Sequence, residues 1–308
     1  MNEILKIKNL SKNFGKKQVL NGINLQLKNS EILTILGESG CGKSTLLRII
    51  AGLESKDGGE ISLLQNYGVA MMFQNYALFP HLNVRENIEF ALHKMGKNER
   101  KARVDELLEK FKIAEISKNS CDKISGGQAQ RVAFARAVAN KERLLLLDEP
   151  FANLDHNLRS ALRSELKQMI KESEISAIMV THDKEDAFVL SDSIALIKSG
   201  EILAIDTPKN LYLNPSSLEV GRFLGDMNFI DHGSLDGLDD RFMAWLKNKN
   251  FMFRPEQILS GGKYKAQVLS STFFGSFYEL DLKFHKLSFK AKISSNIKID
   301  DIFEFDLA

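Results

Sequence analysis

A glycine-rich segment near the N-terminus constrains the fold more than any other feature of the chain. It reads Gly-Glu-Ser-Gly-Cys-Gly-Lys-Ser over residues 37–44 and fits the pattern G-x-x-x-x-G-K-[ST]. A continuous apolar run, 32–36, precedes it, and a helical pattern follows from Ser44 to a stop at Gly52. A strand that leads through such a loop into a helix directs backbone N–H groups at an anion. The segment therefore predicts a phosphate-binding loop between a strand and a helix.

The side chains of this loop indicate a nucleoside triphosphate as the ligand. Lys43 is placed to reach the β- and γ-phosphates, and Ser44 to offer its hydroxyl to Mg²⁺. Cys41 is interpreted as a small filler residue that also makes the loop a target for thiol reagents. A glycine-rich turn without a ligand is the alternative, which the strand–loop–helix context disfavours.

Two adjacent carboxylates end a second apolar run. The sequence Leu-Leu-Leu-Leu over residues 144–147 is followed by Asp148 and Glu149. Acids at the carboxyl edge of a parallel sheet lie where such folds bind ligands. Asp148 suits the Mg²⁺ shell and Glu149 suits the polarisation of an attacking water. The alternative, a solvated acidic strand end, is disfavoured by the phosphate-binding loop in the same chain.

A third segment, Ser-Gly-Gly-Gln over residues 125–128, precedes a helical pattern at 129–140. A hydroxyl and two glycines at a helix N-terminus predict a second anion site. Ordinary N-cap chemistry at Ser125 is the alternative for this segment considered alone.

Composition narrows the classes of protein. The 308 residues are 44% hydrophobic and 27% charged, which excludes a disordered chain and suggests more than one domain. Lys and Arg number 42 against 40 Asp and Glu, a net charge of +2 that argues against a general nucleic-acid binder. Two cysteines favour a reducing compartment, and the first residues lack the apolar core of a signal peptide. The longest uncharged stretch, 61–84, contains Pro80 and several amides, so we expect no membrane span.

The pattern along the chain predicts two domains. Strand and helix signals alternate over residues 1–228, which is typical of an α/β sheet, with a helical subdomain at about 85–140. Within the first 35 residues we expect antiparallel strands with turns near Gly15 and Gly22. Residues 229–308 alternate apolar and polar positions, which predicts a small β-rich domain. The predicted fold class is therefore α/β, a phosphate-loop core with a mixed sheet, flanking helices and a helical subdomain, plus a small C-terminal β domain.

The motifs GESGCGKST, ISGGQAQR, LLLLDEP and VTHD, in this order, resemble those of the ATP-binding subunits of ABC transporters. The resemblance covers about residues 1–224. It implies a head-to-tail homodimer in which residues 125–128 of one chain cover the ATP held by the loop of the other chain. It also assigns Phe14 to adenine stacking, Gln74 to Mg²⁺ and coupling, Asp155 to the dimer seam and His182 to the γ-phosphate.

Each assignment has a plainer alternative when its residue is taken singly. Phe14 is then a core aromatic, Gln74 a polar loop residue and His182 a strand-end histidine. The resemblance favours Glu149 and His182 as the catalytic residues and Ser44, Gln74 and Asp148 as the metal site. The predicted nucleotide-binding residues are Phe14, Gly37, Ser39, Gly40, Cys41, Gly42, Lys43, Ser44, Thr45, Gln74, Ser125, Gly126, Gly127, Gln128 and Asp155.

Further segments resemble those of importer subunits. Residues 77–88 are similar to the part that contacts the permease, although core packing explains Leu78 and Leu82 equally well. Residues 253–256 and the β-rich tail resemble the accessory oligonucleotide-binding-like domain of importers for sugars, polyamines, oxyanions and ferric iron. Two departures from the family are Ala129, where Gln is frequent, and a shortened stretch between Glu60 and Gln74.

The resemblance implies an ATPase that powers solute import, with ATP and Mg²⁺ as cofactors. Its spacing is most similar to the ferric-iron subgroup, and a polyamine, sulfate or molybdate, a sugar or thiamine are the alternative solutes. Its implied partners are a second copy, integral-membrane permease subunits and, indirectly, a solute-binding protein, at the cytoplasmic face of the inner membrane. A soluble ATPase acting on nucleic acid or ribosomes is disfavoured, because the chain has balanced charge and no second ATPase domain. A regulatory module without activity is disfavoured because Glu149 and His182 are both present.

Overall fold

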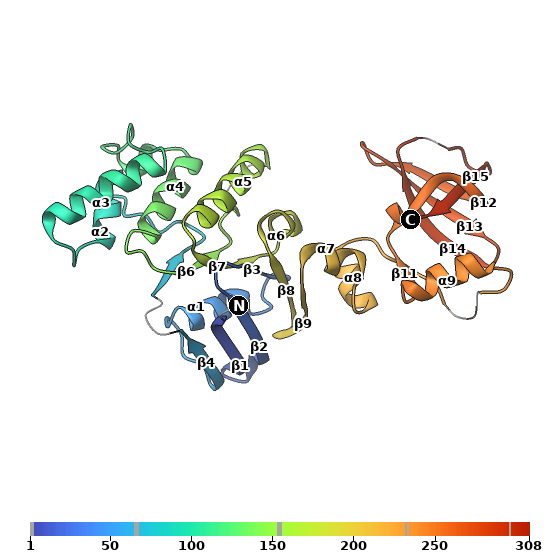
Figure 1. Ribbon diagram of the computed structural model, residues 1–308, viewed down its shortest axis with the longest axis horizontal. Helices are drawn as coiled ribbons and strands as arrows, with labels where there is room; N and C mark the ends of the chain where they lie inside the picture. The colour runs from blue at the N-terminus through green and yellow to red at the C-terminus, as the bar shows by residue number, and fades with distance from the viewer. Residues whose placement is uncertain (1–2, 65–67, 153–155, 232, 234, 296) are drawn as a thin grey trace. The chain divides into compact units, whose positions relative to one another are not determined.

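The computed structural model describes residues 3–64, 68–152, 156–231, 233, 235–295 and 297–308 (Figure 1). The chain divides into two compact units, Met1–Pro208 and Lys209–Ala308. The second unit begins before the predicted domain boundary at residues 228 and 229. That boundary was drawn where the sequence pattern changes, whereas the compact unit also includes the helices that precede the change.

A six-stranded mixed sheet forms the centre of the first unit, in the order β5-β6-β7-β3-β8-β9. The first five strands in this order are parallel, and β9 pairs antiparallel with β8. The central strands are buried on both faces because their sequences are nearly continuous apolar runs. The strand bounds are Ile32–Leu36 for β3, Val69–Met72 for β5, Leu144–Asp148 for β6, Ser176–Thr181 for β7, Ser193–Lys198 for β8 and Glu201–Asp206 for β9.

A second, antiparallel sheet of the first unit has the order β2-β1-β4, with bounds Glu3–Phe14 for β1, Lys17–Lys28 for β2 and Gly58–Leu63 for β4. The turn predicted at Gly15 lies between β1 and β2 as expected. The turn predicted at Gly22 is wrong, because β2 continues through this residue. Leu10 pairs with Ile23 and Lys12 with Leu20, so β2 has one extra residue there. Gly22 has φ 62°, a conformation that suits a bulge and lets the strand pairing resume.

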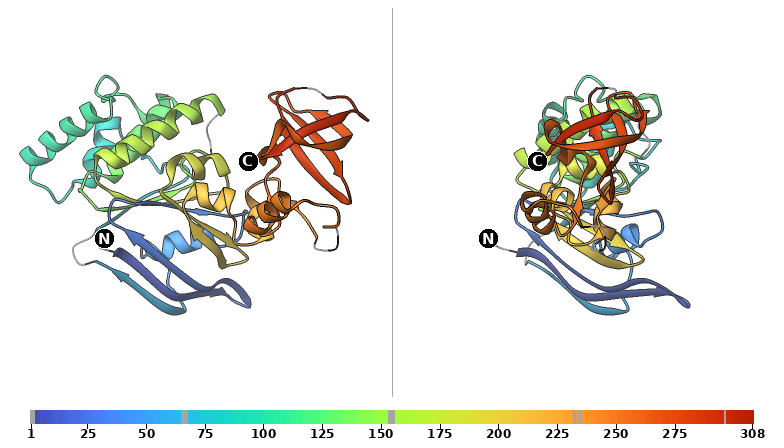
Figure 2. Two further views of the ribbon diagram at one scale, coloured as in Figure 1. Left: turned by 45° about the vertical axis from the view of Figure 1, so that its right-hand side comes forward. Right: turned by 90° about the vertical axis from the view of Figure 1, so that its right-hand side faces the viewer.

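The helices of the first unit lie on both sides of the mixed sheet. Helix α1 (Lys43–Ile50) packs between the two sheets, where its apolar side joins a core with β1, β2 and β3 (Figure 2). Helices α2 (Val84–Ala91), α3 (Lys97–Lys110) and α4 (Gly126–Ala137) lie together within the range predicted for the helical subdomain (Figure 1). The remaining helices are η1 (Cys121–Lys123), α5 (His156–Glu172) and α6 (Lys184–Leu190).

The second unit contains a four-stranded antiparallel sheet in the order β14-β13-β12-β15. Its core is rich in aromatic rings, which the period-two pattern of the tail directs to one face. The bounds are Pro208–Leu213 for α7, Leu218–Leu224 for α8, Asn228–Phe229 for β10, Asp240–Asn248 for α9, Met252–Phe253 for β11, Pro255–Gln257 for η3, Ile258–Phe273 for β12, Tyr278–Phe284 for β13, Leu287–Ile293 for β14 and Ile302–Leu307 for β15.

Arg254 explains why the second unit begins early. Its guanidinium is fully buried and donates to the backbone carbonyls of Tyr212, Gly221 and Asp226 at 2.8–2.9 Å. These carbonyls belong to α7, to α8 and to the segment after α8, so one side chain ties both helices to the β domain. Over the residues that the structure describes, no helix is long and apolar enough to cross a membrane.

Candidate functional site

The phosphate-binding loop connects β3 to α1, as the sequence predicts. Gly40 and Gly42 have φ values of 82° and 106°, in the region that favours glycine. A Cβ atom at Gly42 would lie 2.8 Å from the backbone oxygen of Val19. The loop therefore needs glycine at this position both for its backbone angles and for its close approach to β2.

Lys43 lies over the inside of this loop. Its ammonium donates to the backbone carbonyls of Gly37 and Glu38, each at 2.8 Å, and the residue is 5% exposed. These two main-chain carbonyls hold the ammonium near the loop's N–H groups. This arrangement provides a cationic site for a phosphate group.

Ser44 and Asp148 meet although they lie on different elements. The Ser44 hydroxyl, in the first turn of α1, donates to Asp148 Oδ1 at the end of β6, at 2.9 Å. Asp148 is buried, and this burial raises the pKa of its carboxyl group. A hydroxyl and a carboxylate are the oxygen ligands that suit Mg²⁺. Both predicted residues thus fit one metal site.

Glu149 and His182 also face each other. His182 follows β7, and its Nδ1 lies 3.2 Å from Glu149 Oε2. Glu149 has φ 45°, which is uncommon for a residue other than glycine, and its N–H donates to the carbonyl of Val180 at 3.0 Å. Backbone strain of this kind is frequent at functional sites, because the surrounding structure must hold it. Here it turns the chain sharply between Asp148 and Glu149.

These residues come together because their strands are neighbours. β6, β7 and β3 are consecutive in the sheet, and their carboxyl ends lead into Glu149, His182 and the phosphate-binding loop respectively. The structure therefore gathers a cation, a candidate metal site, a carboxylate and an imidazole along one edge. This arrangement is able to bind a phosphate ester and activate a water beside it.

The position of His182 depends on a buried arginine that the sequence analysis missed. Arg163 of α5 is 4% exposed and donates from Nε to Asp186 Oδ1 at 2.6 Å. Asp186 also accepts from the Thr181 hydroxyl at 3.2 Å, and Asp183 caps α6. Both flanks of His182 are therefore fixed to α5. Arg163 lies among charged residues of its helix, Arg159 and Lys167, so the sequence offered no signal that it is buried.

Ser125 caps α4 through a reciprocal pair of hydrogen bonds. Its N–H donates to Gln128 Oε1 at 3.0 Å, and its Oγ accepts from the Gln128 N–H at 3.4 Å. The predicted helix at 129–140 therefore begins earlier, at Gly126, and ends at Ala137. Ser125 and Gly126 are exposed. Gly127 is buried.

The two predicted phosphate-binding segments do not meet within one chain. Helix α4 lies among α2 and α3, apart from α1, in both views (Figures 1 and 2). Within the described part of the chain, no hydrogen bond or ion pair joins residues 125–128 to residues 37–45. Any contact of Ser125 with a nucleotide must therefore involve another molecule or a rearrangement.

Gln74 lies in an exposed turn after β5. Tyr76 and Ala77, two and three residues further on, have φ values of 61° and 46°. Arg136 of α4 donates to the backbone carbonyls of both, each at 2.8 Å, and burial lowers the pKa of its guanidinium. Arg136 thus links the Gln74 turn to the helix that Ser125 caps. The sequence analysis missed this link, because nothing in a helical Arg between two Ala residues identifies a partner some 60 residues away.

Phe14 ends β1 and is 48% exposed, so it is not a core aromatic. It pairs in register with Lys17, which lines a cavity of about 320 Å³ together with Ser39 and Gly40 of the phosphate-binding loop. Cys41 lines the same cavity and is largely buried, and burial raises the pKa of its thiol. Asp155, the remaining predicted site residue, lies outside the described residues.

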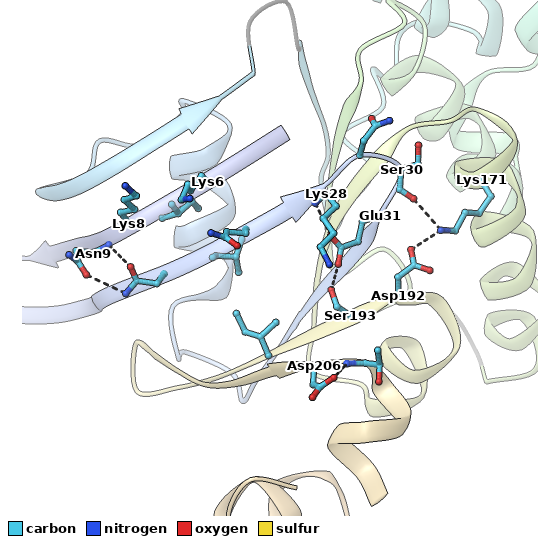
Figure 3. Close-up of a pocket in the computed structure, with 17 residues that line it drawn as sticks. Lys6, Lys8, Asn9, Lys28, Ser30, Glu31, Lys171, Asp192, Ser193 and Asp206 are labelled. Atoms are coloured by element: carbon cyan, nitrogen blue, oxygen red, sulfur yellow. Dashed lines mark hydrogen bonds and ion pairs between the residues drawn. The ribbon is translucent and has the colours of Figure 1, made fainter. Parts of the chain in front are cut away.

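A larger cavity, of about 980 Å³, lies at the other end of β3 (Figure 3). The Lys171 ammonium there donates to Asp192 and to the carbonyl of Ser30, and the Ser193 hydroxyl donates to Glu31. None of the predicted site residues lines this cavity. Its volume therefore does not by itself identify it as the predicted nucleotide site.

The chain is similar in sequence to known proteins. A family model described as ABC transporter matches residues 20–152. The Fe(3+) ions import ATP-binding protein FbpC of Vibrio cholerae is 36% identical, over 94% of this chain and 90% of that protein. The spermidine/putrescine import ATP-binding protein PotA of the same organism is 41% identical, over 77% of this chain and 66% of that protein.

A solved structure is similar as well. This is cbiO1 from Clostridium perfringens, described as part of the ABC transporter complex cbiONQ, with a TM-score of 0.63 and 28% sequence identity. The likeness covers 68% of this chain and 91% of that chain. Sequence and fold therefore lead to the same family, the ABC transporters.

Proposed function

This chain belongs to the ABC transporter family as an ATP-binding subunit, and we propose that it hydrolyses ATP to power ferric iron import through a membrane permease. The observation that carries the ATPase role is the row formed by Lys43, the Ser44–Asp148 pair and the Glu149–His182 pair. Iron is favoured by the share of the chain that aligns with some of the Fe(3+) relatives. The Fe(3+) relative of Vibrio cholerae aligns over 94% of the chain, whereas the polyamine relative of the same organism aligns over 77%.

The phosphate-binding loop holds the triphosphate in this proposal. Lys43 turns from its own loop carbonyls toward the β- and γ-phosphates, and the loop N–H groups bind the phosphate oxygens. Ser44 and Asp148 hold Mg²⁺, and Gln74 completes the metal site from its turn. A bound Mg²⁺ would neutralise charge that develops on the phosphate oxygens.

Glu149 acts as the general base in the hydrolytic step. It accepts a proton from the attacking water as the water oxygen bonds to the γ-phosphorus, and ADP leaves with the electron pair of the broken P–O bond. His182, whose Nδ1 lies 3.2 Å from Glu149 Oε2, positions this carboxylate before ATP binds, and it turns its single N–H toward the γ-phosphate once the nucleotide is in place. The strained backbone of Glu149 supports this assignment, because it directs the carboxylate beyond the strand end.

The site is shared between two copies of the chain in this proposal. Ser125 and Gly126 are exposed and distant from their own phosphate-binding loop, which supports a role against the ATP of a partner. Residues 125–128 of one copy then cover the nucleotide held by residues 37–45 of the other, with Asp155 at the seam. Arg136 couples the two segments in this proposal, because its hydrogen bonds to Tyr76 and Ala77 make the Gln74 turn shift when α4 shifts.

The permease binds beside that turn, at the cytoplasmic face of the membrane. Phe90 of α2 is 55% exposed, and its ring lies 4.5 Å from that of Phe79. An aromatic pair with one exposed ring, next to the Gln74 turn, suits a short helix of a membrane subunit. Leu78 instead packs against the core of the helical subdomain. A solute-binding protein delivers iron to the permease and does not contact this chain.

Mixing two inactive variants tests the shared site. Lys43→Ala removes the cation of one loop, and Ser125→Arg blocks the segment that covers the partner's ATP. Each homodimer should be inactive, whereas mixed dimers contain one site in which Lys43 and Ser125 are both intact. We expect the mixture to recover ATPase activity. Strong activity of the Ser125→Arg homodimer alone would contradict the shared site.

The solute is tested with the chain assembled on its permease in vesicles. ATP hydrolysis should rise when an iron-loaded solute-binding protein is added outside. Spermidine with its own binding protein serves as the matched comparison. A response to the polyamine alone would contradict iron import and leave the ATPase assignment intact.

A further inference from the structure

A nearly buried lysine lies beneath the exposed ring of Phe14. Lys12 is 5% exposed, although it is only two residues from the end of β1. Lysine side chains are rarely buried to this extent unless they are paired. The Lys12 ammonium lies 5.0 Å from the centroid of the Phe14 ring, within the range of a cation–π interaction.

Three groups from one loop hold this ammonium in place. Lys12 Nζ donates to Glu54 Oε1 at 2.8 Å and to Ser55 Oγ at 3.2 Å, and Asp57 Oδ1 lies at 3.7 Å. Asp57 also accepts hydrogen bonds from the backbone N–H and the side-chain amide of Asn13, at 2.7 and 3.1 Å. The loop therefore holds both the Lys12 side chain and the neighbouring residue Asn13 at the end of β1. The hydrogen bond to Glu54 also raises the pKa of Lys12, so its charge is retained at neutral pH.

The loop that holds Lys12 follows the helix of the phosphate-binding loop. Helix α1 begins at Lys43 and ends at Ile50, and Glu54 comes four residues later. One end of α1 thus meets the phosphates, and the segment beyond its other end fixes the lysine under Phe14. Helix α1 therefore connects the phosphate-binding loop to the segment that holds the lysine.

We propose that Lys12 is a positioning residue for the adenine base, because its ammonium holds one face of the Phe14 ring and leaves the other face for the base. This rests on the proposed function, in which Phe14 stacks on adenine. The cation fixes the ring's orientation before the nucleotide arrives, and it draws electron density from the ring, which strengthens stacking of an electron-rich purine. Lys12 acts through the ring and does not touch the nucleotide.

The test is a set of binding and turnover measurements on the full-length chain. We expect Lys12→Met to raise the Kd for ADP and for ATP by about fivefold, since the ring loses its cation partner. The kcat at saturating ATP should change by less than about twofold, because Lys43, Glu149 and His182 remain in place. Lys12→Arg should retain most of the affinity, because a guanidinium also stacks on an aromatic ring.

A double-variant cycle separates action through the ring from other roles. Phe14→Ala should raise the Kd for ADP by about tenfold, and adding Lys12→Met to it should cause little further change. A lysine that contacted the phosphates directly would weaken ATP more than ADP, and would do so in the Phe14→Ala background too. Either observation would overturn the proposal.

Two further variants deal with folding and with surface charge. Glu54→Gln keeps Lys12 but loosens it, and should raise the Kd by about twofold without unfolding the chain. Lys6→Met removes a lysine from the same strand, whose partner is Glu3, and should leave the Kd unchanged. If Phe14→Ala weakens binding but Lys12→Met and Glu54→Gln do not, the inference about Lys12 is wrong and the base site stands. If Phe14→Ala has no effect, the base site proposed at Phe14 fails together with the inference.

Discussion

The two compact units use buried polar groups in different ways. In the first unit they lie at the carboxyl edge of the sheet, where Lys43 donates to its own loop and Asp148 accepts from Ser44. In the second unit Arg254 donates to three backbone carbonyls and holds α7 and α8 to the β domain. The first group of contacts is available to a ligand, because each can be exchanged for a phosphate or a metal. The second is a structural tie with no such exchange.

The apolar cores of the two units also differ in composition. The two apolar clusters of the first unit consist mainly of aliphatic residues on strands and helices, beneath an edge that carries strained residues such as Glu149. The core of the second unit is built around aromatic rings, among them Phe242, Phe284 and Phe305 in mutual contact. The comparison indicates that catalytic and stabilising functions are separated along the chain. Trp245, the only tryptophan of the sequence, lies in the second unit and reports its folding alone.

Replacement of Glu149 should produce the largest effect. Glu149→Gln keeps the shape of the side chain but removes the base, so ATPase activity should fall by at least about 100-fold. The variant should still bind ATP, and because it does not hydrolyse the nucleotide, a dimer should form with ATP that size-exclusion chromatography detects. Glu172→Gln, at the exposed end of α5, is the matched control and should keep full activity. A Glu149→Gln variant that remained monomeric with ATP and Mg²⁺ would contradict the dimer.

Replacement of Arg254 should have the next largest effect, confined to the second unit. Arg254→Met leaves three carbonyls without their charged donor, and should lower the free energy of unfolding of this unit by about 3 kcal/mol. Trp245 fluorescence during urea unfolding measures this loss. ATP hydrolysis per folded chain should be unchanged, because each predicted catalytic residue lies in the first unit.

The matched control for Arg254 is an exposed arginine of the same unit. Arg241 pairs with Asp306 at 2.8 Å and its side chain is 54% exposed, so Arg241→Met should cost at most about 0.5 kcal/mol. A loss of ATPase activity in Arg254→Met that Arg241→Met does not share would show that the second unit contributes to the catalytic site. That result would contradict the assignment of catalysis to the first unit alone.

Loss of a helix cap in the first unit should have a smaller effect. Asn83 caps α2 and accepts from the Glu86 N–H at 2.9 Å, while Glu86 accepts from the Asn83 N–H at 2.8 Å. Asn83→Ala should lower the free energy of unfolding of the first unit by about 1 kcal/mol. Far-UV circular dichroism should detect the shift, and Trp245 fluorescence should not. A shift seen equally by both probes would mean that the units unfold together.

The smallest expected effect is a pH dependence of the second unit. Asp239 accepts from Lys263 and from the Phe242 N–H, and these hydrogen bonds lower its pKa to about 2. A carboxyl group whose pKa is lower in the folded state stabilises the fold above its unfolded pKa of about 3.9, and this contribution disappears as the pH falls through about 2. In the unchanged chain, the unfolding midpoint that Trp245 reports should fall by this component as the pH drops from about 4 to about 2. Asp239→Asn should lack this part of the pH dependence. An identical pH profile for both proteins would contradict the assignment.

The motifs allowed a large part of the site to be predicted because their chemistry is local. The glycine spacing of residues 37–44 allows few backbone conformations. The two acids that follow residues 144–147 mark the end of a buried strand, because charged side chains must leave the apolar core. The contacts that position these groups were not predictable in the same way. Arg163, Arg136 and Lys12 lie 23, 60 and 42 residues from Asp186, Tyr76 and Glu54. No periodicity in a single segment identifies such partners.

The sequence by itself determined which residues can bind a phosphate, accept a proton or turn a strand into a helix, since these properties depend on residue type and close spacing. The tertiary structure decided which of them meet. The strand order β6-β7-β3 brings Glu149, His182 and the phosphate-binding loop to one edge, and strand order depends on packing across the whole sheet. It also decided that Gly22 is a bulge and that α7 and α8 belong to the second unit, because the pairing of β1 and the buried charge of Arg254 outweigh the local pattern.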